Sequence, residues 1–198
     1  MAQKSTKRPP VRRPPVKKGG TSRMFYIGIS VVVVIGIILI LVAKSAKNDE
    51  VAAAAANDPG AACQPEVESV DYGQQHTSDD VQYAEDPPLS GTHDPVWTTP
   101  GVYSEPQRDE NVVHALEHGD IVIYWDPAQP ELGEKLADFA NTRGVLTNDV
   151  LVMPRAGLRA DVVATSWARS IDCTGFAGAD VNAFVEAHHD AGPEGVTD

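Results

Sequence analysis

The segment HALEHGDIVIYW, residues 114–125, decides the fold, because it joins side chains suited to metal binding directly to a core segment. Ile121 to Trp125 is a continuous apolar and aromatic run that favours a strand, and it is long enough for one buried strand. His114 and His118 are four residues apart and can share one helical face, with Glu117 beside the second. The segment therefore predicts two histidines held at the edge of a buried strand.

On the C-terminal side, periodicity predicts a helix and then two strands. Pro130 to Arg143 is expected to be a helix that ends at Gly144, a residue favoured after helix C-termini. Val150 to Met153 and Asp161 to Trp167 are expected to be strands. The turn formers Ala156-Gly157 lie between these strands and predict that the two pair antiparallel.

The last predicted element is a helix capped by Asp180, with Val181, Phe184 and Val185 at helical spacing. The resulting order of strand, helix, strand, strand, helix predicts a small α+β domain, with a mixed sheet and two packed helices.

On the N-terminal side, residues 73–111 lack regular patterning and are rich in turn formers such as Pro87-Pro88 and Pro100-Gly101. Unstructured connections of this length are uncommon in compact domains and are usually functional or disordered. The spaced aromatic residues Tyr83, Trp97 and Tyr103 favour an ordered loop pinned to the core. A weak alternation over 66–72 predicts one short strand before the loop.

Charge divides the chain into two opposite parts. Ten of the 16 basic residues precede residue 48, whereas all 28 acidic residues follow Lys47, which leaves six basic residues and a net charge of −22 there. So acidic a domain repels phosphate, and we expect no nucleic-acid partner.

Residues 24–43 carry no charge and are dominated by Val and Ile, which matches the ~20 residues needed to cross a bilayer. Eight basic residues precede this segment and two follow it, so the positive-inside rule predicts a cytoplasmic N-terminus. We expect a basic, Pro-rich cytoplasmic tail (1–23), an uncleaved single-pass transmembrane helix (24–43), a linker (44–62) and an extracytoplasmic domain (63–195) in the cell membrane.

Cys63 and Cys173 are the two cysteines. Outside the cytoplasm, one disulfide that closes a loop of roughly 110 residues is the expected outcome. The alternative is a pair of thiolate metal ligands.

Four histidines, His76, His93, His114 and His118, precede the first core strand. Imidazole suits copper and zinc, and Met153 could add the thioether that copper sites use, so copper is the predicted ion and zinc the alternative. Glu117 is expected to support the ligands from outside the metal's own shell.

Three other hypotheses remain open for these residues. The histidines could instead staple the loop to the core through carbonyl groups. The loop 73–111 could present Trp97 and Tyr103 to a protein partner, as a non-catalytic interaction module. The H-x-x-E-H spacing of 114–118 also matches zinc peptidases, in which the glutamate activates water, although barely one helical turn fits before Gly119.

The sequence also resembles a bacterial family called domain of unknown function 3105. The resemblance rests on His76, Val81-Gln-Tyr83, the block 87–93 (Pro-Pro-Leu-Ser-Gly-Thr-His), Pro95, Trp97, Gly101-Val-Tyr103, the block 113–119 (Val-His-Ala-Leu-Glu-His-Gly), Trp167, Cys173 and Gly192-Pro-Glu194. It covers about residues 63–195 and implies a membrane-anchored or secreted domain with no assigned activity. It singles out the same four histidines.

Overall fold

The computed structural model describes residues 23–143 and 149–195. The chain divides into two compact units, residues 1–44 and 45–198. Helix α1, Arg23–Ala54, runs across this boundary, so the predicted linker is helical as far as Ala54. Gly144, the predicted helix-ending residue, lies outside the described part.

Where side chains are described, none of the helices combines the length and apolarity that crossing a bilayer requires. Side chains of residues 24–32, which belong to the predicted span, are not among those described. The transmembrane helix therefore stays a prediction.

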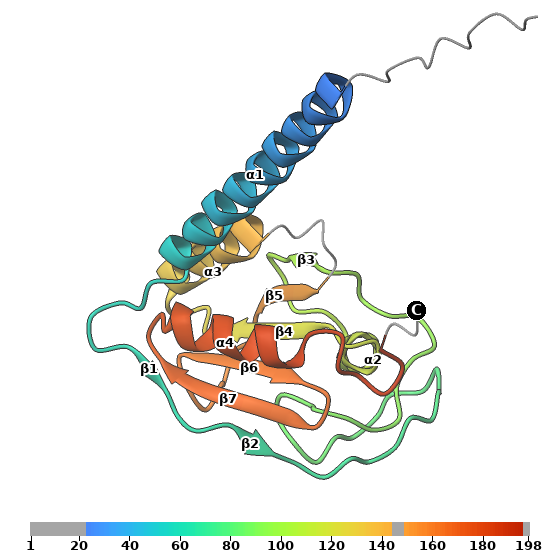
Figure 1. Cartoon of the computed structure of the whole chain (residues 1–198). Coiled ribbons are helices and arrows are strands. Elements are labelled where there is room, and N and C mark those ends of the chain that lie inside the picture. Colours follow the sequence, from blue (N-terminus) through green and yellow to red (C-terminus); the bar gives the residue numbers. More distant parts are fainter. Residues whose placement is uncertain (1–22, 144–148, 196–198) are drawn as a thin grey trace, which may run out of the picture. The chain divides into compact units, whose positions relative to one another are not determined.

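The second unit is an α+β domain built on one mixed sheet (Figure 1). Its strands are β1 (Ala62–Cys63), β2 (Val67–Glu68), β3 (Gly101–Val102), β4 (Ile121–Trp125), β5 (Val150–Pro154), β6 (Val162–Ser166) and β7 (Arg169–Thr174). Their order in the sheet is β1-β7-β6-β4-β5-β3, and β2 also pairs with β7. The helices are α2 (Asp109–Glu117), α3 (Pro130–Arg143) and α4 (Gly178–His188).

Strand β4 is central because its side chains are apolar on both faces. Ile121 and Ile123 face one cluster with residues of α3 and α4, whereas Val122 and Tyr124 face a second cluster that includes Leu116 of α2. These four side chains are completely buried, and Trp125 at the end of the strand is partly buried. The strand thus joins two cores, one on each face of the sheet.

The predicted direct pairing of the strands at 150–153 and 161–167 is wrong. Strand β4 lies between them, parallel to β5 and antiparallel to β6. The turn at Ala156-Gly157 does reverse the chain, but a completely apolar strand gains most by burial on both edges, so β4 occupies the centre. Helix α3 provides the crossover that parallel neighbours require.

One further prediction needs correction, and one strand, β7, was not predicted. Asp180 does not cap the last helix, because α4 begins at Gly178 after Ala177; its Oδ2 instead accepts a hydrogen bond from the Cys63 backbone N–H at 3.0 Å. The predicted strand that starts at Asp161 is the first arm of a hairpin, and β7 is its second. The predicted Cys63–Cys173 disulfide is confirmed, and it joins paired residues of β1 and β7.

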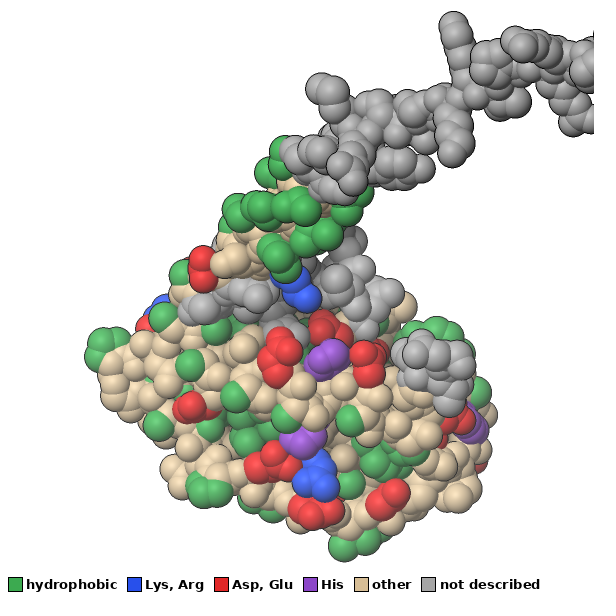
Figure 2. All heavy atoms as spheres, viewed as in Figure 1, with side chains coloured by type: hydrophobic (Ala, Val, Ile, Leu, Met, Phe, Trp, Pro, Cys, Tyr) green, Lys and Arg blue, Asp and Glu red, His purple; other side chains and the backbone are tan. Residues whose placement is uncertain are grey.

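Acidic side chains are spread over the face of the domain that Figure 2 shows, with few basic ones between them.

Candidate metal centre

Two histidines of the long loop are brought together by a short parallel bridge. His93 donates its backbone N–H to the Gln75 carbonyl at 2.9 Å and accepts one from Thr77 at 2.7 Å, so His76 and His93 lie side by side. Their ring centroids are 4.6 Å apart. The loop is therefore ordered here by backbone pairing, which the sequence pattern does not predict.

Helix α2 supplies the other members of the cluster. His114 and Glu117 lie within the helix, and His118 is its C-terminal cap residue. The rings of His114 and His118 stack at 4.8 Å between centroids, as residues one helical turn apart can. The predicted arrangement of two histidines on one helical face is thus present.

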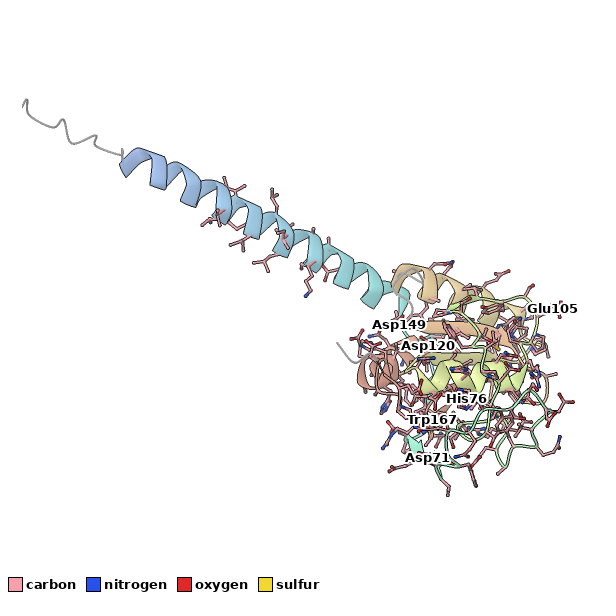
Figure 3. All side chains as sticks on the ribbon, turned by 90° about the vertical axis from the view of Figure 1, so that its right-hand side faces the viewer. Asp71, His76, Glu105, Asp120, Asp149 and Trp167 are labelled. Atoms are coloured by element: carbon pink, nitrogen blue, oxygen red, sulfur yellow. A yellow bond between two sulfur atoms is a disulfide. The ribbon has the colours of Figure 1, made fainter. Side chains whose placement is uncertain are left out.

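Four side chains converge on one point. His76, His93, His114 and Glu117 each offer one ligand atom, and these atoms all lie within 4.8 Å of one another. Glu117 and His93 are completely buried, His114 is 5% exposed, and 40% of the His76 side chain is exposed. We call this group the inner set. His76, its exposed member, is labelled in Figure 3 together with Trp167, whose ring meets His93 edge-on.

Backbone carbonyls fix which nitrogen of the two buried histidines is available. The Nδ1–H of His93 donates to the Gly91 carbonyl at 2.7 Å, and the Nδ1–H of His114 donates to the Asp94 carbonyl at 2.6 Å. A carbonyl can only accept, so in the neutral rings the lone pair is on Nε2. Outer hydrogen bonds of this kind orient histidine ligands in metal sites.

The Glu117 carboxylate requires a cation or a proton beside it in the inner set. Its Oε2 lies 2.9 Å from His93 Nε2, and its Oε1 is buried with no hydrogen-bond partner among the described residues. Both Oε2 and the unprotonated Nε2 are acceptors, so a shared proton or a metal ion must lie between them. A buried carboxylate oxygen with no partner is costly unless it binds a cation.

Burial lowers the pKa of His114, and positive charge on the neighbouring histidines lowers it further, against the opposing hydrogen bond to the Asp94 carbonyl. The pKa shift favours the neutral imidazole, which is the form that binds metals.

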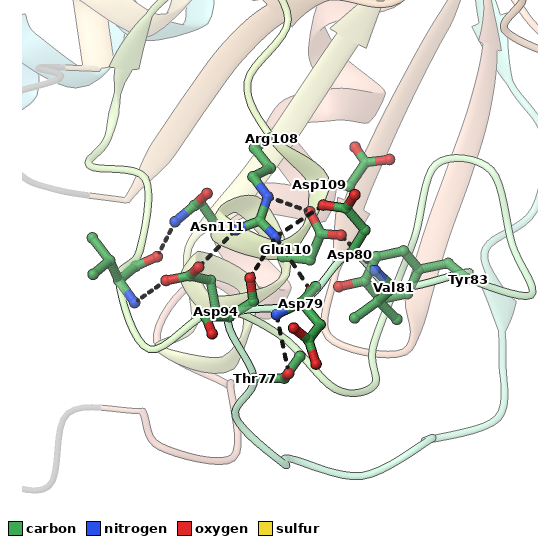
Figure 4. A network of polar contacts seen from close by, with 12 residues as sticks. Thr77, Asp79, Asp80, Val81, Tyr83, Asp94, Arg108, Asp109, Glu110 and Asn111 are labelled. Carbon is green, nitrogen blue, oxygen red and sulfur yellow. Dashed lines mark hydrogen bonds and ion pairs between the residues drawn. The ribbon is translucent and has the colours of Figure 1, made fainter.

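Arg108 anchors the loop to the start of α2 (Figure 4). Its guanidinium donates to Asp94 Oδ2 at 2.6 Å and to the Asp79 carbonyl at 3.2 Å, and its Nε lies 3.1 Å from Glu110. Glu110 in turn accepts a hydrogen bond from the Val81 backbone at 2.7 Å. Because the Asp94 carbonyl also orients His114, this network holds both arms of the loop where the ligands meet.

A second group of ligand-type atoms overlaps the first. His114, His118 and Glu194 offer atoms that also lie within 4.8 Å of one another, and we call them the outer set. The Nε2 atoms of His114 and His118 are 3.0 Å apart, and the Trp97 ring lies 5.1 Å from the His118 ring. Sequence reasoning missed Glu194 as a candidate ligand, although the Gly-Pro-Glu segment that contains it was part of the family resemblance.

The predicted site residues fall into three groups. His76, His93 and His114 come together as predicted, and His118 adjoins them through His114. The Glu117 carboxylate lies among the ligand atoms rather than outside them. Met153 packs in the apolar cluster between α2 and the sheet, so its role as a thioether ligand stays a prediction.

Asp120 is the residue immediately before β4 and lies two positions after His118 in the sequence. It is 8% exposed, and Figure 3 labels it near Asp149. Burial, with the negative charges of Asp149 and Asp190, raises the pKa of Asp120 to about 7. The folded domain thus favours the protonated carboxyl.

Asp120→Asn is expected to stabilise the domain at pH 8. Because the pKa of Asp120 is raised from 3.8 to about 7, its contribution to stability is full below pH 3.8 and is lost as the pH rises through 7. The amide does not ionise, so the free energy of unfolding should increase by on the order of 4 kcal/mol at pH 8 and change little at pH 4. Urea unfolding at the two pH values measures this, and an equal effect at both would contradict it.

The family model described as Protein of unknown function (DUF3105) matches residues 74–198. The match covers both blocks that carry the inner set and extends through Glu194. No curated protein and no solved structure matches the chain.

Proposed function

The chain belongs to the DUF3105 family, and from that premise we propose that its domain binds one transition-metal ion through His76, His93, His114 and Glu117. One observation carries the proposal. A completely buried carboxylate turns one oxygen to His93 and leaves the other without a partner among the described residues, at the point where three imidazoles converge. A metal ion would satisfy all four groups at once.

The spacing of the donors supports this assignment. Metal–nitrogen bonds of ~2.0–2.1 Å place tetrahedral ligand atoms about 3.3 Å apart. Glu117 Oε2 lies 2.9 Å from His93 Nε2 and 3.9 Å from His76 Nε2, and all four ligand atoms lie within 4.8 Å of one another. Since His76 is half-exposed, a small rotation of its side chain can close the longer separation.

Copper(II) is the ion we propose, with zinc as the alternative. Three imidazole nitrogens and one carboxylate oxygen suit both ions and are unsuited to magnesium or calcium, which take mainly oxygen ligands. In sites of nitrogen and oxygen donors copper(II) binds more tightly than zinc, so it should win a direct competition.

The position of Glu117 argues against the peptidase alternative. A general base must reach a water molecule, whereas the Glu117 side chain is completely buried and contacts His93. The role of ligand fits that burial better.

We further propose that the domain lies outside the cytoplasm on a single-pass anchor. Two observations support this. A disulfide joins Cys63 and Cys173, as expected in an oxidising compartment. The apolar side chains from Val33 to Val42 are each more than half exposed, as a lipid-facing helix requires.

The test is elemental analysis of the purified full-length chain, without a histidine tag, after exposure to copper and zinc and extensive buffer exchange. We expect about one retained equivalent, mainly copper when both are offered. His76→Ala should reduce retention strongly without unfolding the domain, because His76 is the most exposed member of the inner set. His188→Ala is the matched control, since His188 pairs with Glu66 and not with the cluster.

If the wild-type chain retains no metal, the proposal fails. A domain whose histidines staple the loop, and whose exposed Val96 and Trp97 form a partner surface, then becomes the leading account.

A further inference from the structure

His114 belongs to both ligand sets. The inner set contains His76, His93 and Glu117 beside it, and the outer set contains His118 and Glu194. The Nδ1–H of His114 is committed to the Asp94 carbonyl at 2.6 Å, so its Nε2 is the one nitrogen left to bind a metal. One lone pair cannot serve two ions, so the sets are alternative positions for a single ion.

The two sets differ in burial, although His76 of the inner set is itself 40% exposed. Glu117 and His93 are completely buried, and His114 is nearly so. His118 is partly buried and Glu194 is exposed. The outer set therefore lies nearer the surface than Glu117 and His93, the two completely buried members of the inner set.

Glu194 is far from α2 in the sequence, but backbone hydrogen bonds place it beside the C-terminal end of that helix. The Glu194 N–H donates to the Glu117 carbonyl at 3.0 Å, and the Asp190 N–H donates to the Gly119 carbonyl at 2.9 Å. Between them the chain passes so close that a Cβ on Gly192 would lie 2.2 Å from the Glu117 carbonyl oxygen. Glycine is thus required for this approach, and the segment that carries Glu194 is fixed on the helix rather than adjacent by chance.

We propose that the outer set is the entry position of the metal, and that the ion passes from it to the inner set while His114 stays bound. This inference rests on the proposed function. In the transfer, the coordination bonds to His118 and Glu194 break as bonds to His76, His93 and Glu117 form. The ion keeps its oxidation state, and the proton shared by His93 and Glu117 leaves to solvent.

Two tryptophans lie at opposite ends of the two sets, although Trp97 is also 5.5 Å from the shared His114. The Trp97 ring lies 5.1 Å from His118, and the Trp167 ring lies 6.1 Å from His93. Because copper(II) quenches nearby indole fluorescence, loading should give a fast phase from Trp97 and a slower one from Trp167. Trp97→Phe should remove the fast phase and keep the slow one.

The experiment mixes the metal-free full-length chain with copper(II) in a stopped-flow fluorimeter and then measures release to a chelator. Glu194→Gln and His118→Ala should slow both loading and release by about tenfold or more, the scale on which groups around a metal site alter binding. Metal content at equilibrium should stay unchanged, because an entry position alters rates and leaves the final ligands in place. His188→Ala should load at the wild-type rate.

Three results would overturn the inference. If both variants load at the wild-type rate, the outer set is not an entry position. Loss of metal at equilibrium in these variants would make His118 and Glu194 ligands of the final site. Failure of the wild-type chain to bind copper or zinc would remove the proposed function as well, so the two failures are distinguishable.

Discussion

Glu117→Gln should abolish retention of copper and zinc while the domain stays folded. The substitution removes the negative ligand from a buried site, so metal affinity should fall by about 100-fold or more. The fold should survive, because the new amide N–H can donate to His93 Nε2, which now lies 2.9 Å from Glu117 Oε2. That bond needs no shared proton, so the metal-free variant should match the wild type in unfolding free energy to within about 1 kcal/mol.

Ligand-linked stability is a second measure of the same substitution. At a free metal concentration of 100 times the dissociation constant, the wild-type chain should gain about 2.7 kcal/mol of unfolding free energy. The Gln variant should gain almost nothing at that concentration. Glu131→Gln, in the first turn of α3, is a matched control and should behave as the wild type.

The substitution also separates the metal hypothesis from loop stapling. Stapling assigns the histidines and Glu117 a purely structural role, so it predicts no metal-dependent gain in either protein. An unfolded Gln variant would support stapling. A folded variant with wild-type metal affinity would exclude Glu117 as a ligand.

Local patterns predicted the regular elements well. The strand Ile121–Trp125 and the helix Pro130–Arg143 have the predicted bounds, because uniform apolarity and helical periodicity are properties of contiguous residues. The order of strands in the sheet is not such a property. The turn at Ala156-Gly157 shows where the chain reverses, but nothing local indicates that β4 will lie between β5 and β6.

Strand β7 was missed for a related reason. The turn between β6 and β7 lies at Trp167-Ala168. Ala168 has a φ of 55°, a conformation that glycine normally adopts. Without glycine or asparagine there, the sequence carries no hairpin signal.

The candidate site was predictable in most of its members and not in its geometry. Spacing identified His114 and His118, and the resemblance identified all four histidines. The meeting of His76 with His93 depends on a backbone bridge in a loop without periodicity. The direction of Glu117 toward His93 depends on where that loop lies. Both are tertiary facts, so the sequence did not indicate that the Glu117 carboxylate lies among the imidazole nitrogens.

Removal of the disulfide by the double substitution Cys63→Ser and Cys173→Ser should cost about 3–5 kcal/mol of unfolding free energy. The bond spans a sequence separation of 110 residues and encloses the inner set together with β4 to β6, so the reduced unfolded chain gains much conformational freedom. Urea unfolding with and without reductant measures the loss. Reductant should lower the stability of the wild-type chain and leave the double variant unchanged.

Metal affinity should stay unchanged in this double variant, whereas Glu117→Gln should remove it. The inner set is held by hydrogen bonds within residues 75–117 and by Arg108, and none of these contacts involves either cysteine. The folded fraction of the disulfide variant should therefore keep wild-type affinity for copper although the domain is less stable. An equal loss of affinity and stability would mean that the disulfide helps to shape the site, whereas separate losses in the two variants would show that stability and metal binding rest on different parts of the domain.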